Sequence, residues 1–267
     1  MNIKKWGALV AAGALAASLA LFGCSSGDQG TTTSSTSGND AGYTLVNDGK
    51  LTVAASLDFP PFENLNGDKP EGFAVDLMTL LAEEMGLECE YLPSTKFDTI
   101  VPLIQTGARL TSACRSFTIT DKRLQAGGFH RSVLQREPEH HRAQRFGHHR
   151  RRPLEGKKIG AQSGTTGYEW AAENIKDAEV TGYDEMTAVF AALDSGQIDA
   201  VSVDLPVANY YVRSYSDCQV IKEIPTGEQY AVTVSKENPE LTKALNKALQ
   251  AVHDNGKYDE LAAKWLQ

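Results

Sequence analysis

An arginine and several hydroxyl groups lie close together in residues 116–123, which read Ser-Phe-Thr-Ile-Thr-Asp-Lys-Arg. Thr120 suits the N-cap of a helix, so we expect Arg123 to lie within one turn of free backbone N–H groups. Ser116 and Thr118 add two hydroxyls to the same spot. Such a cluster can bind an anion, above all a carboxylate, which an arginine holds through two parallel hydrogen bonds. An ordinary capped surface helix is the alternative for this stretch taken alone.

Further polar groups stand where predicted strands end. A strand is expected over 158–161, and the turn at 162–166 leads into a helix whose N–H groups and hydroxyls form a second anion site. Another strand is expected over 198–203 and is followed by Asp204. Ligands of open α/β sheets bind at the carboxyl ends of the strands, and a carboxylate there suits an ammonium group. The N-cap of the next helix is an equal alternative for Asp204.

The elements that must position these groups alternate between strand and helix, which predicts α/β architecture with largely parallel sheets. Residues 58–63 are expected as an extended turn, because each proline there disfavours helix in the residue before it. A helix begins at Gly72. The other expected strands cover 51–56, 88–92, 179–183 and 230–234, and the other expected helices cover 97–104, 185–194, 205–212, 239–254 and 258–266.

Length and charge limit the possible functions. The 267 residues are enough for two modest domains once a leader is removed. The formal net charge of −8 gives no electrostatic support for binding nucleic acid. Cys89 and Cys218 fall in different halves of the chain, so we expect no disulfide between them.

The N-terminal stretch is typical of a secreted and lipid-anchored protein. Residues 1–23 combine a basic start with a short apolar run, as a signal peptide does. The end of that run, Leu-Phe-Gly-Cys, resembles a bacterial lipobox, so Cys24 is expected to be lipidated. A simple cleaved signal peptide is the alternative. Residues 24–46 are rich in Ser, Thr and Gly and should form a flexible tether. These features predict an extracytoplasmic protein that a lipid holds to the cell membrane.

From Lys50 to the C-terminus the chain resembles the polar amino-acid-binding proteins of ABC importers (solute-binding family 3). Six motifs in order carry the resemblance: Asp58-x-Pro-Pro-Phe-Glu63, Gly72-Phe-x-Val-Asp-Leu77, Ser116-Phe-Thr-Ile-Thr-x-x-Arg123, Gly164-Thr-Thr166, Ile198-Asp-Ala-Val-x-x-Asp204 and Asn255-Gly-x-Tyr-x-x-Leu-x-x-Lys-Trp265. The resemblance implies a Venus-flytrap of the periplasmic-binding-protein type, with two α/β lobes joined by two hinge strands. Lobe 1 would combine 47–134 with 231–267, and lobe 2 would cover 135–230.

The resemblance also implies a ligand site. By position, Arg123 would hold the α-carboxylate of an amino acid, helped by Thr118 and Thr166, and Asp204 would hold its α-ammonium group. The walls and remaining contacts would come from Ser56, Phe59, Phe62, Ser116, Gln162 and Thr165. The neutral Ser56 argues mildly against a lysine or arginine ligand, because a cationic side chain needs a nearby carboxylate. Asp58, close by in sequence, weakens that argument. The resemblance implies no catalytic residue, metal or cofactor.

Two stretches depart from the family pattern. Residues 108–115 should supply a buried strand but carry two arginines without alternation, and residues 128–153 are dense in His, Arg and Gln without periodicity. With suitable codons, the neighbouring reading frame restores the family pattern in both stretches. We therefore hypothesise two compensated frameshifts or sequencing errors, which resequencing the gene would test. If the residues are real, buried arginines should impair folding or ligand binding. A disordered loop is a further alternative.

The leading functional hypothesis is an extracytoplasmic, monomeric receptor that delivers a polar amino acid to an ABC transporter permease. A second is an enzyme, because the same fold resembles cyclohexadienyl dehydratases, although the motifs offer no clear general acid or base. A third is a metal-ion receptor in which the paired histidines at 140–141 and 148–149 act with a nearby glutamate. The seven arginines between 130 and 152 would repel a cation, which disfavours that hypothesis.

Overall fold

The computed structural model describes residues 42–106, 112–121, 123, 142–148 and 153–266, and for 112–116 and 142–148 it gives the course of the backbone. These residues belong to one compact unit, 36–267. The expected signal peptide, Cys24 and the tether up to residue 41 lie outside the described residues. The expected tether is too long at its end, because Tyr43 and Leu45 are buried in the hydrophobic core. Within the described ranges, no helix has the length and hydropathy needed to span a membrane.

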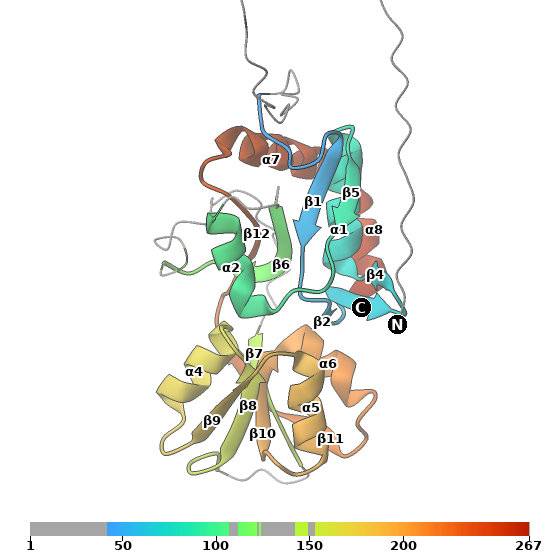
Figure 1. The fold of residues 1–267 in the computed structure, drawn as a ribbon. Helices are drawn as coiled ribbons and strands as arrows, with labels where there is room; N and C mark the ends of the chain where they lie inside the picture. The colour runs from blue at the N-terminus through green and yellow to red at the C-terminus, as the bar shows by residue number, and fades with distance from the viewer. Residues whose placement is uncertain (1–41, 107–111, 122, 124–141, 149–152, 267) are drawn as a thin grey trace, which may run out of the picture. The chain divides into compact units, whose positions relative to one another are not determined.

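The first sheet has the strand order β12-β6-β1-β5 (Figure 1). Strand β1 (Lys50–Ala54) pairs in parallel with β5 (Glu88–Tyr91) and with β6 (Ser112–Thr118). Strand β12 (Tyr230–Val234) comes from much later in the chain and pairs antiparallel with β6. The late strand therefore completes a sheet that the first third of the chain begins.

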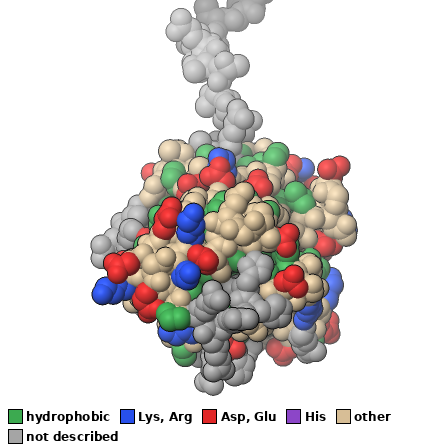
Figure 2. Space-filling view, turned by 90° about the horizontal axis from the view of Figure 1, so that it is seen from below, with side chains coloured by type: hydrophobic (Ala, Val, Ile, Leu, Met, Phe, Trp, Pro, Cys, Tyr) green, Lys and Arg blue, Asp and Glu red, His purple; other side chains and the backbone are tan. Residues whose placement is uncertain are grey.

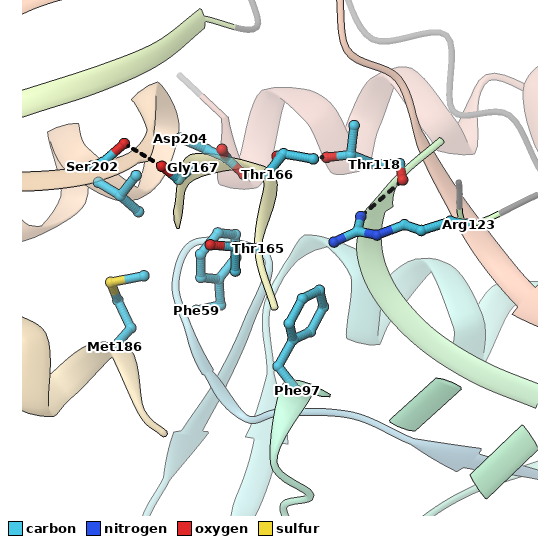
Figure 3. A pocket seen from close by; sticks show the side chains of 11 residues that line it. Phe59, Phe97, Thr118, Arg123, Thr165, Thr166, Gly167, Met186, Ser202 and Asp204 are labelled. Carbon is cyan, nitrogen blue, oxygen red and sulfur yellow. Dashed lines mark hydrogen bonds between the residues drawn. The ribbon is translucent and has the colours of Figure 1, made fainter. Parts of the chain in front are cut away.

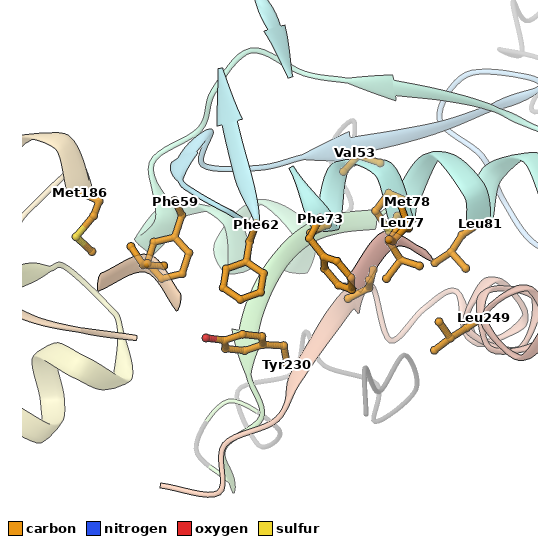
Figure 4. Packing of buried hydrophobic residues seen from close by; sticks show 14 of the residues in the cluster. Val53, Phe59, Phe62, Phe73, Leu77, Met78, Leu81, Met186, Tyr230 and Leu249 are labelled. Atoms are coloured by element: carbon orange, nitrogen blue, oxygen red, sulfur yellow. The ribbon is translucent and has the colours of Figure 1, made fainter. Parts of the chain in front are cut away.

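Four helices belong with the first sheet: α1 (Phe73–Glu84), α2 (Phe97–Gln105), α7 (Pro239–Asp254) and α8 (Lys257–Trp265). A small meander of β2 (Asp58–Phe59), β3 (Glu63–Asn66) and β4 (Lys69–Glu71) precedes α1. The link into α1 needs glycine at position 72, because its φ is +131° and a Cβ would lie 2.2 Å from the carbonyl oxygen of Phe62. The fully buried Phe62 packs edge-to-face on Phe73 and Tyr230 (Figure 4).

The second sheet has the order β11-β7-β10-β8-β9. Strands β8 (Lys158–Gln162), β9 (Glu179–Tyr183) and β10 (Ala200–Asp204) are parallel, whereas β7 (Arg142–His148) pairs antiparallel with both β10 and β11 (Cys218–Pro225). The helices that pack against this sheet are α4 (Thr166–Asn174), α5 (Met186–Asp194) and α6 (Leu205–Val212).

The elements follow the expected alternation, and their bounds agree with the predicted ones to within a few residues. The structure adds the β2–β4 meander and strand β11, which the sequence pattern did not predict. It also places strands β6 and β7 inside the two stretches that depart from the family pattern. Cys89 and Cys218 are free thiols, as expected.

One face of the surface is seen in Figure 2. There, acidic and basic side chains are interspersed, and the hydrophobic side chains are scattered among them. Among the coloured residues on this face no continuous basic patch is present.

Candidate functional site

A partly open space lies where α4 begins and where β6 and β10 end (Figure 3). Its lining combines hydroxyls, one guanidinium, one carboxylate and apolar side chains. A pocket lined in this way suits a small polar ligand. The residues that line it are Phe59, Phe97, Thr118, Arg123, Thr165, Thr166, Gly167, Met186, Ser202, Val203 and Asp204.

Arg123 is the cation of this space. One terminal nitrogen, Nη1, donates to the carbonyl oxygen of Thr118 at 2.9 Å, and Nη2 donates to the carbonyl oxygen of Gly164 at 2.7 Å. The guanidinium carbon lies 5.5 Å from the ring centroid of Phe97 and 5.7 Å from that of Phe117. Two backbone acceptors and two aromatic rings therefore fix the orientation of the charged group, which leaves little rotamer entropy to lose on ligand binding.

The local chain around Arg123 folds as predicted. The Oγ1 atom of Thr120 accepts a hydrogen bond from the backbone N–H of Arg123 at 3.1 Å, which is the capping contact expected from the sequence. Thr118 is the last residue of β6 and is buried, so its hydroxyl lies at the carboxyl end of this central strand.

The start of α4 brings two more hydroxyls to the space. Thr165 is the N-cap, and its Oγ1 accepts from the backbone N–H of Tyr168 at 3.2 Å. The neighbouring Thr166 places its Oγ1 atom 3.5 Å from that of Thr118. The end of β6 in the first sheet and the beginning of α4 beside the second thus present their hydroxyls to each other.

Asp204 is the anion of the space. It ends β10 and precedes α6, but its side chain makes no capping hydrogen bond to that helix. Its Oδ2 atom accepts a hydrogen bond from the hydroxyl of Tyr230 at 2.5 Å. The expected alternative of a side-chain cap for α6 is therefore not observed, and the binding of an ammonium group by Asp204 stays a prediction.

Glu228, between β11 and β12, is a site residue that the sequence analysis missed. Its Oε2 atom accepts hydrogen bonds from the hydroxyls of Thr118 at 3.2 Å and Thr166 at 3.3 Å. Burial, with the nearby charge of Asp204, raises the pKa of Glu228 to about 7, although both threonine hydroxyls and Arg123 act to lower it. No motif marked this residue, because the chain that carries it has neither helix nor strand periodicity.

Three predicted site residues lie behind the space. Ser56 and Gln162 are buried and absent from its lining, and both bond to Asp58. The Oγ of Ser56 donates to Oδ1 of Asp58 at 2.5 Å, and Nε2 of Gln162 donates to Oδ2 at 3.1 Å. Phe62 lies behind Phe59 in the hydrophobic core (Figure 4). The structure thus places these three residues behind the lining, and their direct contact with a ligand stays a prediction.

Of the other predicted residues, the structure brings Phe59, Thr118, Arg123, Thr165, Thr166 and Asp204 together around one space. Ser116 lies in β6, where its side chain is outside the described residues, as are Cys24 and the histidines at 140–141. The apolar lining of Phe97, Met186 and Val203 was missed as site lining. Each of these residues lies in a helix or strand that was predicted, but periodicity does not tell a pocket wall from a core position.

The model of the bacterial extracellular solute-binding proteins, family 3, matches residues 51–267 of this chain. The arginine-binding protein 1 of an Escherichia coli K12 ABC transporter is 26% identical over 223 residues, which are 81% of this chain and 90% of that protein. A probable histidine-binding protein of Neisseria gonorrhoeae is 28% identical over 279 residues, covering 100% and 97% of the two chains.

Solved structures give the same picture. An ancestral arginine-binding protein bound to arginine superposes with a TM-score of 0.72 and 29% identity, over 82% of this chain and 99% of that one. This likeness confirms the predicted two-lobe α/β fold. The names of these similar proteins describe the binding of amino acids, and one of them names an ABC transporter.

Proposed function

Because the chain belongs to family 3 of the bacterial extracellular solute-binding proteins, we propose that it captures a polar amino acid and delivers it to an ABC transporter permease. One observation carries this proposal. The guanidinium of Arg123 and the carboxylate of Asp204 line the same space. Charges of both signs in one pocket suit a zwitterion.

In the proposed complex, the α-carboxylate of the ligand meets Arg123 and the hydroxyls of Thr118 and Thr166. The α-ammonium group meets Asp204, and the rings of Phe59 and Phe97 enclose the side chain. The opposite charges are held in place before the ligand arrives, so little ordering cost remains on binding. Closure of the two lobes would then exclude water from the complex.

The side-chain class is the part of the proposal that the relatives do not decide for this chain. They are named for arginine and histidine, whereas the oxygens of Asp58 here already accept from Ser56, Gln162 and the backbone N–H of Met186. A carboxylate with three donors is a poor partner for a cationic side chain. This supports a polar amino acid with a neutral side chain.

The remaining parts of the proposal concern the chain outside the pocket. We propose lobe 1 as 47–134 plus 231–267 and lobe 2 as 135–230, since the chain leaves the first sheet after β6 and returns to it at β12. We also propose a signal peptide over 1–23, a lipid on Cys24 that holds the protein to the membrane, and action as a monomer.

Calorimetric titration of the full chain with the twenty standard amino acids tests the function. We expect saturable binding of at least one polar amino acid, and loss of that binding in Asp204→Asn. Zinc and prephenate serve as probes of the two alternative functions. A chain that binds prephenate or zinc and none of the amino acids would contradict the proposal.

A further inference from the structure

Glu228 joins two elements that each contribute a threonine to the lining of the pocket. Its Oε2 atom accepts from Thr118 at the end of β6 and from Thr166 at the start of α4. The two threonine hydroxyls themselves are 3.5 Å apart. One carboxylate oxygen therefore bridges the first sheet and α4, a helix that packs against the second sheet.

These are the same two hydroxyls that the proposed function assigns to the α-carboxylate of the ligand. We infer that Glu228 is an internal substitute for that α-carboxylate, which a ligand must displace before it can bind Thr118 and Thr166. The inference rests on the proposed function, because it takes the pose of the ligand from there. The other residues of the site attract the ligand, whereas Glu228 would compete with it.

The surrounding charges fit an internal substitute. Arg123 faces Glu228 as a cation and Asp204 faces it as an anion, while Thr118 and Thr166 supply neutral donors. An arriving carboxylate meets the same cation and the same donors, so the two acids compete for one set of partners. Two carboxylates cannot both remain ionised on the same donors without strong repulsion.

The competition should depend on pH. Burial and Asp204 raise the pKa of Glu228 to about 7, so its side chain is largely neutral at pH 6 and largely ionised at pH 8. The neutral acid does not repel a second carboxylate and leaves the hydroxyls more readily. Ligands with an α-carboxylate should therefore bind more tightly at pH 6 than at pH 8.

The rival role for Glu228 is a second acid for the α-ammonium group beside Asp204. That role predicts the opposite signs. Removal of the carboxylate would weaken binding, and affinity would rise with pH as Glu228 ionises. The two roles are therefore separable by the direction of two measurements.

The test titrates L-arginine, L-histidine and L-glutamine into the full chain, into Glu228→Ala and into the isosteric Glu228→Gln at pH 6 and pH 8. Glu237→Ala, which removes an exposed acid, is the matched control. For Glu228→Ala we expect Kd to fall roughly threefold to tenfold at pH 8 and much less at pH 6. The α-amides of the same amino acids lack the carboxylate, so the wild type and Glu228→Ala should bind them equally.

Unchanged or weaker binding of the free amino acids by both Glu228 variants would overturn the inference and leave the proposed function intact. An equal gain for the α-amides would also overturn it, because the competition would not be for the carboxylate position. If neither the wild type nor the variants bind any amino acid, the proposed function fails and the inference fails with it. Binding by Glu228→Ala alone supports both.

Discussion

The backbone N–H of Met186 donates a hydrogen bond to Oδ2 of Asp58 at 2.6 Å, although the two residues are 128 positions apart in the chain. Met186 is the first residue of α5, and Asp58 is a buried acid in β2. A negative charge at the N-terminus of a helix is favourable because it faces the unpaired N–H groups there. Asp58 therefore supplies α5 with a cap from a distant part of the chain.

Asp58→Asn should weaken this link. The amide carries no charge for the helix start, and it has one acceptor oxygen for the three donors that the two carboxylate oxygens now accept from. We expect a loss of roughly 1–3 kcal/mol in the free energy of unfolding, measured by urea denaturation. The exposed Asp68→Asn in the β3–β4 turn is the matched control. Equal stability of the two variants would show that the contact contributes little.

Arg123→Lys should impair binding without unfolding the protein. Lysine keeps the positive charge but loses the planar fork that reaches the carbonyl groups of Thr118 and Gly164 together. We expect Kd for the bound amino acid to rise about 10-fold to 100-fold in calorimetry. Arg213→Lys, at the exposed end of α6, should leave Kd unchanged. A normal Kd for Arg123→Lys would rule out bidentate recognition by this arginine.

Asp204→Asn and Tyr230→Phe together separate charge from local structure. If Asp204 binds the ammonium group, the asparagine variant should raise Kd by at least about 30-fold. Tyr230→Phe keeps the ring that packs on Phe62 and removes the hydroxyl that contacts Asp204. It should change Kd by less than about fivefold. Equal losses in the two variants would mean that Asp204 serves mainly to hold Tyr230.

Local patterns predicted much of the fold and part of the site. Neighbouring residues within a few positions determine three of these features, so the sequence predicts them: Thr120 as a cap, Asp204 at a strand end and the hydroxyls at the start of α4. Local patterns could not predict where the side chains of Ser56 and Gln162 lie. Both side chains turn towards Asp58, and that contact forms only when β1, β2 and β8 are brought together.

The role of Glu228 could not be predicted from local sequence patterns either. It lies between β11 and β12, and the residues it contacts are 62 and 110 positions away. Strands β6 and β7 are a different case, because their sequences show no strand alternation. Strand β6 pairs with β1 and β12, and β7 pairs with β10 and β11, so tertiary pairing forms both strands. The frameshift hypothesis for those stretches stays a prediction about the gene.

Stability should depend on pH through Glu228. Its pKa is raised to about 7 in the folded protein against 4.5 in the reference state, first by burial and then by Asp204. Between these two values the folded chain binds more protons than the unfolded chain, so the free energy of unfolding falls as pH rises. The loss begins near pH 4.5 and is complete above pH 7. Its size is on the order of 3 kcal/mol.

Glu228→Gln removes this titration, because the amide stays neutral throughout. Other groups titrate in both proteins and cancel in the difference between them. We expect the melting temperatures of the wild type and Glu228→Gln to be close at pH 5, and the wild type to melt several degrees lower at pH 8. Glu237→Gln should instead follow the wild type at both values. If the wild type and Glu228→Gln melt in parallel from pH 5 to pH 8, Glu228 is not a buried acid in the folded protein.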